Sequence, residues 1–346
     1  MIVRIFSLLG LMSALFWTAG CERKTETSAT AAAGAPIVLR FGHVGLANTG
    51  NIPEGPVGYA YTRGLLEPAL AKIGISKVEF VRSGGPTANQ VFAAGQIDVY
   101  QTGETGGIIG KGAGLDIQLI NIDKLEYKTV LIGRKDGPAT VKELAGKKVS
   151  GGMVGTNGWH YVHELLKRAG IRDKVELVTI PLGGGEAALL RGDIDAYGES
   201  FYAISPEARG FRVLDNSNDH EGLSGLYVTV GGRAFLERHP EFAGVFNEVV
   251  AEAVVRMRAN PDDFYAFMKT TSNLSDAALR EHYPLRIWST DPVPARGLRA
   301  IEYTKAFLLD ERAFRKDFDL QAWIAPNIYR GLAQPSAGPA GKEAGL

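Results

Sequence analysis

The sequence predicts an α/β protein of two similar lobes, each a mostly parallel β-sheet flanked by helices, with a ligand cleft between the lobes. Strand-like apolar segments alternate with helical segments from residue 37 onward, an order typical of parallel βαβ units. One unit is also written twice: the segments beginning at Lys72 and Arg168 both run Gly-Ile, a basic residue, Val-Glu-x-Val, a glycine pair, a short apolar helix and Gly-x-Ile-Asp. Because 346 residues suffice for two hydrophobic cores, the repeat indicates two lobes of the same plan.

Residues 1–20 are predicted to be an export signal. Arg4 precedes an uncharged apolar run at 5–17, which is too short for a membrane-spanning helix. The small residues before Cys21 resemble a bacterial lipobox, in which the cysteine carries a lipid; a plain signal peptide with a chance cysteine is the alternative. Residues 21–36 are expected to form the lipidated cysteine and a flexible tether. We therefore expect a protein in the periplasm or on the outer face of the cell membrane, anchored by its lipid.

The first lobe is expected to begin with a buried strand, because IVLRFGHV is an apolar run that ends at a loop rich in glycine and asparagine. Helices and strands then alternate in the order that parallel pairing requires. In chain order, the sequence predicts a strand at 37–44, a helix at 57–72, a strand at 77–81, a helix at 87–94, and strands at 97–100, 116–122 and 127–135.

The cycle restarts in the second lobe. Its predicted elements are a strand at 147–152, a helix at 159–169, a strand at 174–180, a short helix from Glu186 and a strand at 194–197. The strand at 225–232 is expected to return to the first lobe, because only helices follow it. Among those helices, one has apolar residues at helical spacing from Phe242 to Met257, and the next starts at Asn260 and Pro261.

These elements give the predicted domain organisation. Residues 37–126 plus 228–330 form lobe 1, residues 127–227 form lobe 2, and residues 331–346 form a disordered tail. The chain carries 38 basic and 38 acidic residues, so no basic face is offered to nucleic acid.

The candidate site is predicted at the carboxyl ends of the strands, where ligands bind in open α/β sheets. Both copies of the repeat carry glycine-rich or polar loops there, at 84–86 and 101–105 in the first and at 183–185 and 198–202 in the second. Two lobes that face each other through such ends enclose a cleft that can close by a hinge motion.

A further loop, Gly155-Thr156-Asn157, precedes a clear helix. Its backbone N–H groups would form a seat for an oxyanion or carboxylate, and an ordinary N-cap by Asn157 is the alternative. The residues expected to bind the ligand are Leu46, Asn48, Gly85, Thr102, Glu104, Thr105, Thr156, Asn157, Trp159, Gly184, Glu199, Tyr202 and Tyr227.

The chain resembles the extracytoplasmic solute-binding proteins of bacterial ABC importers, in the NMT1/THI5-like branch that binds aliphatic sulfonates, taurine and nitrate. The segments that carry the resemblance are AAGQIDVYQTGETGGIIGKGAGLDIQLI, VKELAGKKVSGGMVGTNGWHYVHELLKRAGI, LLRGDIDAYGESFYAISPEA and YTKAFLLDERAFRKDFDLQAWIAPNIY. The similarity runs from Ile37 to Tyr329. It implies a two-lobed type II periplasmic-binding-protein fold, a monomer without cofactor or metal, and delivery of a small organic solute to an ABC permease in the inner membrane.

Two departures from the family bear on the ligand. Glu199, Ser200, Phe201 and Tyr202 stand in a region where the family commonly carries a tryptophan, and Glu104 stands where sulfonate binders more often have aspartate. A carboxylate from each lobe favours a zwitterion, such as an amino-sulfonate, over a simple anion. The alternative is that both carboxylates cap helices or pair with arginines.

An enzyme on the same fold is the second candidate function, because a sulfinate desulfinase and a thiamine-pyrimidine synthase resemble these proteins. The desulfinase needs a cysteine nucleophile in the first lobe, whereas the only cysteine here is Cys21, assigned to the lipobox. The cysteine-rich iron motif of the synthase is also absent. His160, His163 and Glu164 share a helix and could recruit zinc, but a solvated helix face is favoured.

Overall fold

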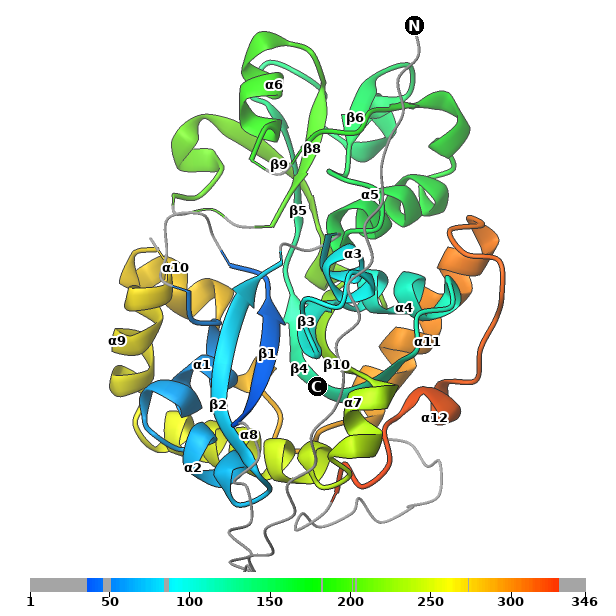
Figure 1. Cartoon of the computed structure of the whole chain (residues 1–346). Helices are drawn as coiled ribbons and strands as arrows, with labels where there is room; N and C mark the ends of the chain where they lie inside the picture. Colours follow the sequence, from blue (N-terminus) through cyan, green and yellow to red (C-terminus); the bar gives the residue numbers. More distant parts are fainter. Residues whose placement is uncertain are drawn as a thin grey trace, which may run out of the picture. The chain divides into compact units, whose positions relative to one another are not determined.

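Two five-stranded sheets, each flanked by helices, make up the protein in Figure 1. The computed structural model describes residues 36–45, 51–83, 87–181, 183–200, 202, 204–272 and 274–329. The predicted export signal, Cys21, most of the tether and the C-terminal tail lie outside these residues. None of the described helices is both long and apolar enough to cross a membrane.

The first sheet has parallel strands on one side and an antiparallel return strand within it. Its order is β2 (Ile75–Arg82), β1 (Ile37–His43), β3 (Val99–Gly103), β10 (Gly225–Gly232) and β4 (Ile117–Tyr127). β1 pairs in parallel with β2 and β3, whereas β10 is antiparallel to β3 and β4. The strand at 225–232 therefore returns to the first sheet, as predicted.

The second sheet repeats this plan. Its order is β7 (Glu176–Leu177), β6 (Lys148–Ser150), β8 (Ala196–Glu199), β5 (Val130–Arg134) and β9 (Phe211–Asn216). β6 pairs in parallel with β7 and β8, and β5 is antiparallel to β8 and β9. The predicted fold class is confirmed, with one correction: half of the strand pairings in each sheet are antiparallel, so both sheets are mixed rather than mostly parallel.

Helices cover both faces of each sheet. Around the first sheet lie α1 (Gly55–Thr62), α2 (Leu66–Ala71), α3 (Ala88–Ala93), α4 (Glu104–Gly112), α7 (Arg233–Arg238), α8 (Phe242–Ala259), α9 (Pro261–Thr271), α10 (Asp276–His282), α11 (Ala295–Asp310) and α12 (Leu320–Trp323). In Figure 1, α1 and α2 lie to one side of this sheet and α4 and α11 to the other. The predicted helix 57–72 is broken at Gly64, whose φ of +66° no helix contains.

The second sheet is covered by α5 (Asn157–Arg168) and α6 (Gly185–Arg191). Alternation along β5 explains their opposite placement, because successive side chains of a strand point to opposite faces. Leu131 packs in a core cluster with Leu165 and Leu166 of α5, whereas Ile132 packs with Leu189 of α6.

The repeated aspartates, Asp98 and Asp195, form the same pair of hydrogen bonds to a neighbouring strand in both sheets. Arg40 N donates to Asp98 Oδ2 at 3.0 Å, and Asp98 N donates to Arg40 O at 2.9 Å. In the second sheet Lys148 N donates to Asp195 Oδ2 at 3.0 Å, and Asp195 N donates to Lys148 O at 2.7 Å. Each aspartate thus joins the start of one strand to its parallel neighbour.

Two elements were not predicted from the sequence. The segment 104–112 contains four glycines, which disfavour a helix, yet it forms α4 because it packs against Val228 and Trp323. The strand β9 (FRVLDN) lacks clean alternation of apolar and polar residues, so the sequence pattern did not indicate a strand. It forms one because it pairs with β5.

Helix α11, which precedes the short α12, reaches across to α5. The Phe307 ring centroid lies 4.5 Å from the His160 ring and 5.9 Å from the Trp159 ring, and Tyr303 OH donates to Glu164 Oε1 at 2.6 Å. The helix face that carries His160, His163 and Glu164 was expected to be solvated. It is instead covered by α11, and both histidines are buried.

We predict that Asp98→Ala and Asp195→Ala each lower the free energy of unfolding by about 1–3 kcal/mol, because each leaves a backbone N–H without its carboxylate acceptor. Urea unfolding followed by circular dichroism measures the change. Asp193→Ala is the matched control, since Asp193 is exposed and pairs only with exposed Arg191 among the described residues. Equal stability of the control and the two variants would contradict the assignment.

Candidate functional site

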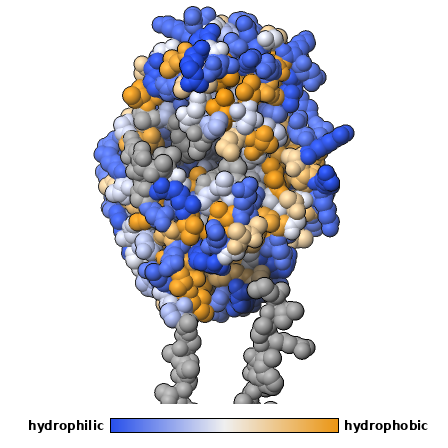
Figure 2. Space-filling view, turned by 45° about the horizontal axis from the view of Figure 1, so that its top comes forward, coloured by the Kyte–Doolittle hydropathy of each residue, from blue (hydrophilic) through white to orange (hydrophobic). Residues whose placement is uncertain are grey.

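A cavity of about 660 Å³ lies between the carboxyl ends of strands from the two sheets. Val44 follows β1, Gly103 ends β3, Gly151 follows β6 and Glu199 ends β8, and all four line the cavity. This is the position predicted from the rule for open α/β sheets. Its volume lies within the ~300–1,000 Å³ of small-molecule sites. In Figure 2 the surface is hollowed between the two halves of the protein. We call this cavity the cleft.

The half of the protein that is built on the first sheet, here called the first half, contributes backbone to the cleft at the start of α4; the half built on the second sheet is called the second half. Thr102, Gly103 and Gly106 line it. A Cβ on Gly103 would stand 2.6 Å from Asn157 Oδ1, so only glycine lets the end of β3 approach the start of α5 this closely. The two halves therefore meet directly behind the cleft at these two helix starts.

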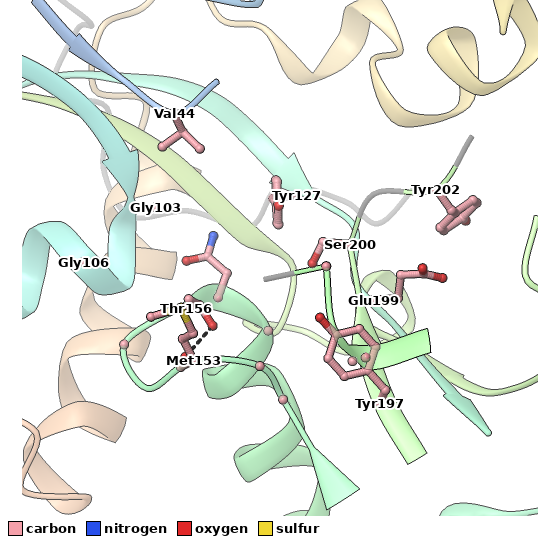
Figure 3. Close-up of a pocket in the computed structure, with 18 of the residues that line it drawn as sticks. Val44, Gly103, Gly106, Tyr127, Met153, Thr156, Tyr197, Glu199, Ser200 and Tyr202 are labelled. Atoms are coloured by element: carbon pink, nitrogen blue, oxygen red, sulfur yellow. Dashed lines mark hydrogen bonds between the residues drawn. The ribbon is translucent and has the colours of Figure 1, made fainter. Parts of the chain in front are cut away.

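The second half contributes the loop 151–158 and the N-terminus of α5. Thr156 is the N-cap: its Oγ1 accepts from Trp159 N at 3.2 Å and donates to Met153 O at 2.8 Å, a bond drawn in Figure 3. The alternative of an N-cap by Asn157 is wrong, because Asn157 Nδ2 instead donates to Leu226 O on β10 at 3.0 Å. The positive end of a twelve-residue helix thus opens into the cleft.

Tyrosines form the side walls. Tyr127 and Tyr227 lie 5.1 Å apart between ring centroids, and Tyr197 and Tyr202 line the cleft from the second half, as Figure 3 shows for Tyr127, Tyr197 and Tyr202. Tyr202 is held by its hydroxyl, which donates to Glu281 Oε1 at 2.9 Å. These rings supply apolar faces to the cleft. Tyr127 ends β4, Tyr197 lies on β8, and Tyr202 follows the end of β8.

The charged groups of the cleft are paired with one another. Arg209 donates from Nη1 to Glu186 Oε2 and from Nη2 to Glu199 Oε2, each at 2.5 Å. Burial raises the pKa of Glu199, and the Arg209 guanidinium acts in the opposite direction. Two carboxylates share one guanidinium, so this group carries one net negative charge when all three are ionised.

A second pair, Glu54 and Lys124, lies at the cleft beside the tyrosines. Lys124 Nζ is 3.2 Å from Glu54 Oε1, and Tyr283 OH donates to Glu54 Oε2 at 2.5 Å. The ammonium lies 4.7 Å from the Tyr227 ring centroid and 4.6 Å from that of Tyr283, within range of cation–π attraction. Burial lowers the pKa of Lys124. No local pattern pointed to this pair, because its members are 70 residues apart.

Glu104 lies behind the cleft rather than in it. It is 1 % exposed, and its Oε2 accepts from Leu226 N at 2.8 Å. Thr304 Oγ1 lies 3.5 Å from its Oε1, so a strand of the first sheet and the helix α11 that packs on that sheet enclose the carboxyl group, with Asn157 of α5 as a further hydrogen-bond partner. Burial raises the pKa of Glu104 to about 7, against the effect of the hydrogen bonds it accepts.

The structure divides the predicted ligand-binding residues into three groups. Thr102, Thr156, Asn157, Glu199, Tyr202 and Tyr227 line the cleft. Glu104, Thr105, Trp159 and Gly184 are absent from the lining formed by the described residues. Thr105 and Glu104 are buried in the first turn of α4, and Trp159 packs on His163 and Phe307. Leu46, Asn48 and Gly85 lie outside the described residues.

Sequence reasoning missed several lining residues. Gly151 and Gly152 could have been found from the glycine pair that ends the predicted strand 147–152, whereas Gly198 was already included in the predicted loop 198–202. Arg209, Glu54 and Tyr127 carry no such signal, because they reach the cleft only through tertiary packing.

Within the described part of the chain, no group of three or more His, Cys, Asp and Glu residues could hold a metal ion. His160 and His163 sit under α11, where burial lowers the pKa of each to about 3. Both histidines are packing residues, since the His160 ring contacts Phe307 of α11 and the His163 ring contacts Trp159 within α5.

Comparison with known proteins agrees with this architecture. Residues 127–264 match the family described as NMT1/THI5 like. The chain is 26 % identical over 341 residues to a "putative aliphatic sulfonates-binding protein" of Bacillus subtilis (strain 168), covering 96 % of this chain and 98 % of that protein. The predicted resemblance is confirmed.

Two solved structures share the fold. The alkanesulfonate-binding protein SsuA from Xanthomonas axonopodis pv. citri, bound to MOPS, superposes with a TM-score of 0.67 at 17 % identity, over 84 % of this chain and 99 % of that one. A mutant of DSZB in complex with biphenyl-2-sulfinic acid superposes with a TM-score of 0.63 at 17 % identity, over 85 % and 98 % of the two chains. The fold is therefore one that both binding proteins and an enzyme use.

We predict that Glu104→Gln flattens the pH dependence of stability. The pKa of Glu104 is about 7 in the folded protein against an ordinary 4.5, so the folded state holds this proton more tightly. Its contribution is present below pH 4.5 and is lost as the pH rises through 7. Relative to the parent, the variant should gain up to about 3 kcal/mol between pH 4.5 and pH 8.

Urea unfolding at both pH values measures this difference. Glu252→Gln is the control, because Glu252 is half-exposed and paired with Arg256 on the surface of α8. An unchanged pH dependence in Glu104→Gln would show that the carboxyl group is ionised in the folded protein throughout this range.

Proposed function

We propose that this protein captures a small organic sulfonate, or a solute of the same shape and charge, and delivers it to an ABC importer. The observation that carries the proposal is the N-terminus of α5 opening into a cleft enclosed by both halves of the chain. A solute held there contacts both halves, which would favour a closed state for presentation to a permease.

The sulfonate head is assigned to the loop 151–157 and the starts of α4 and α5. Helix N-termini and glycine-rich loops present backbone N–H groups that suit an oxyanion with several acceptor oxygens. Gly152 and Gly155 adopt φ values of +92° and +83°, so this loop turns sharply just before the helix. In this half of the cleft the lining is mainly backbone and small side chains, namely Gly151, Gly152, Gly155, Thr156 and Gly158.

The organic body of the solute would lie between the tyrosine walls, and a cationic group would face Glu186 and Glu199. Among the described residues those two carboxylates share one guanidinium, that of Arg209, so their group retains one negative charge for a ligand ammonium. Glu104 takes no part, since its carboxyl group is buried behind the cleft. The MOPS bound to the Xanthomonas protein is a sulfonate that also carries an amine, which supports a zwitterionic ligand for this chain.

The N-terminal segment would tether this activity to a membrane. Residues 1–20 would direct export, and lipid on Cys21 would hold the protein in the periplasm or at the outer face of the cell membrane, with 21–36 as the tether. Lobe 1 would comprise 37–126 and 228–330, and lobe 2 would comprise 127–227, except that Tyr127 and residues 225–227 pair within the first sheet and so belong with lobe 1. Nothing in this role calls for a cofactor, a metal or a second copy of the chain.

Desulfination is the second candidate, because DSZB shares the fold and is seen with a sulfinate. Cys21, the only cysteine in the sequence, precedes the first strand by sixteen positions, counted from Cys21 to Ile37. The cleft lining formed by the described residues contains no thiol for a nucleophilic role. Binding without chemistry is therefore the better-supported function.

We predict that the parent binds taurine more tightly than ethanesulfonate, which differs from taurine by the loss of the ammonium group. Glu199→Gln should weaken taurine binding by about tenfold to a hundredfold, the loss of one charged hydrogen bond of roughly 1.5–3 kcal/mol, and leave ethanesulfonate nearly unchanged. Isothermal titration calorimetry with both solutes measures this.

Glu176→Gln serves as the control, since Glu176 is exposed on β7 and pairs with Lys148. If Glu199→Gln binds ethanesulfonate more tightly and taurine equally, the carboxylate is part of the scaffold and the ligand is a plain anion. If the parent binds neither taurine nor ethanesulfonate and releases sulfite from an aryl sulfinate, the desulfinase activity is favoured instead.

We predict that Cys21→Ser releases the exported protein from the membrane, because no other residue of the chain offers a thiol for the lipid. Fractionation of expressing bacteria, with mass spectrometry of the product, measures anchoring. Ser28→Ala, in the predicted tether, is the control and should stay with the membrane. Membrane association of exported Cys21→Ser would rule out the lipid anchor.

A further inference from the structure

A second cavity, of about 960 Å³, lies at the connections between the two sheets, and its lining shares no described residue with the cleft. One side is formed by the end of β4 and by α11, and the other by the end of α5 and the segment that joins β9 to β10. We call it the arginine groove, after its lining residues Arg168, Arg286, Arg296 and Arg299.

The arginines outnumber the carboxylates that line the groove. Arg286 Nη2 lies 3.0 Å from Glu126 Oε2, and Arg296 Nη2 lies 2.8 Å from Glu126 Oε1, so two guanidiniums share one carboxylate. Glu221 is the other lining carboxylate. Arg168 also pairs with Glu164 of α5 at 3.0 Å, so four arginines against these three glutamates leave one positive charge in excess.

Arg299 adds a cation with no hydrogen bond or ion pair among the described residues. It follows Arg296 by three positions on α11 and precedes Tyr303 by four, so these three side chains share one face of the helix. Arg168 completes the groove from α5, where it donates to Glu221 O at 3.1 Å and to Tyr303 OH. Arg168 Nε also donates to Glu164 Oε1 at 3.0 Å, and Tyr303 OH donates its proton to the same oxygen at 2.6 Å. Guanidinium groups therefore converge on the groove from α5 and from α11, whereas the Tyr303 hydroxyl is already used within the protein.

The groove also spans the two chain crossings. Glu126 lies just before residues 128–129, which join β4 to β5, and Glu221 lies in 217–224, which join β9 to β10. A ligand in the groove would contact both crossings at once.

We propose that the arginine groove binds a multivalent oxyanion of the phosphate class. A guanidinium pairs with phosphate through two parallel N–H donors, and several of them around one anion relieve their mutual repulsion. Arg286, Arg296 and Arg299 are the primary contacts, with Arg168 of α5 opposite. The side chains of Arg286 and Arg296 are 66 % and 57 % exposed, which leaves the groove open to a bulky or surface-borne anion.

The test uses the full chain and two phosphate sources. Inorganic pyrophosphate is titrated by calorimetry at constant ionic strength, and sedimentation is measured with vesicles of phosphatidylcholine with and without phosphatidylglycerol. The variants are Arg299→Gln, which breaks no ion pair among the described residues, and Arg296→Gln/Arg299→Gln. Arg256→Gln/Arg280→Gln is the control, because it removes two exposed arginines that are paired with Glu252 and Asp262 elsewhere.

The proposal expects the parent to bind pyrophosphate or the phosphatidylglycerol vesicles, and expects Arg299→Gln to weaken that binding by about tenfold and the double variant by more. Binding of pyrophosphate alone identifies a soluble ligand, and a vesicle response alone identifies a lipid headgroup. The segment before residue 36 is common to all variants, so its own membrane affinity cancels. Absence of binding to both probes, or equal weakening in the control, overturns the proposal.

Discussion

The constraint on which the rest of the structure depends is the repeated aspartate that joins the strands of each sheet. Asp98 and Asp195 each accept a backbone N–H from the parallel neighbour and donate their own N–H back to it. This fixes β3 against β1 and β8 against β6, so the loops after these strands end at one edge of each sheet. Because both edges face the same cleft, the same aspartate hydrogen bonds, repeated in each sheet, position both sides of the candidate site.

The fold could be predicted from the sequence because its information is local and repeated. The period-two strands, the helical spacing and the duplicated Gly-x-Ile-Asp segment can all be recognised in this one sequence. The position of the site at the carboxyl ends of the strands follows from the topology alone. The missed helix α4 shows the limit of this reasoning. Its glycines argue against a helix locally, and only its packing against Val228 and Trp323 makes the helix stable.

The site residues could be predicted only in part, because the sequence does not show in which direction each side chain points. Glu104 and Glu199 both follow the glycine of a repeated Gly-Glu pair, yet Glu199 reaches Arg209 at the cleft and Glu104 turns back to Leu226. The difference arises because α4 begins at Glu104, which puts its side chain in the first turn against α5, whereas β8 ends at Glu199 without a helix directly after it. Contacts of this kind, like that between Glu54 and Lys124, join residues far apart in sequence and leave no local pattern.

The internal pairing of charges explains how the cleft could distinguish solutes. Lys124 is balanced by Glu54, and Arg209 is shared by Glu186 and Glu199, so the described residues that form or border the cleft leave no full positive charge to attract every anion. The attraction for an anionic head then falls to backbone dipoles at the starts of α4 and α5, which act only at short range and in fixed directions. A site of this kind selects by geometry. An anion whose oxygens cannot reach those N–H groups gains little from the cleft, whatever its net charge.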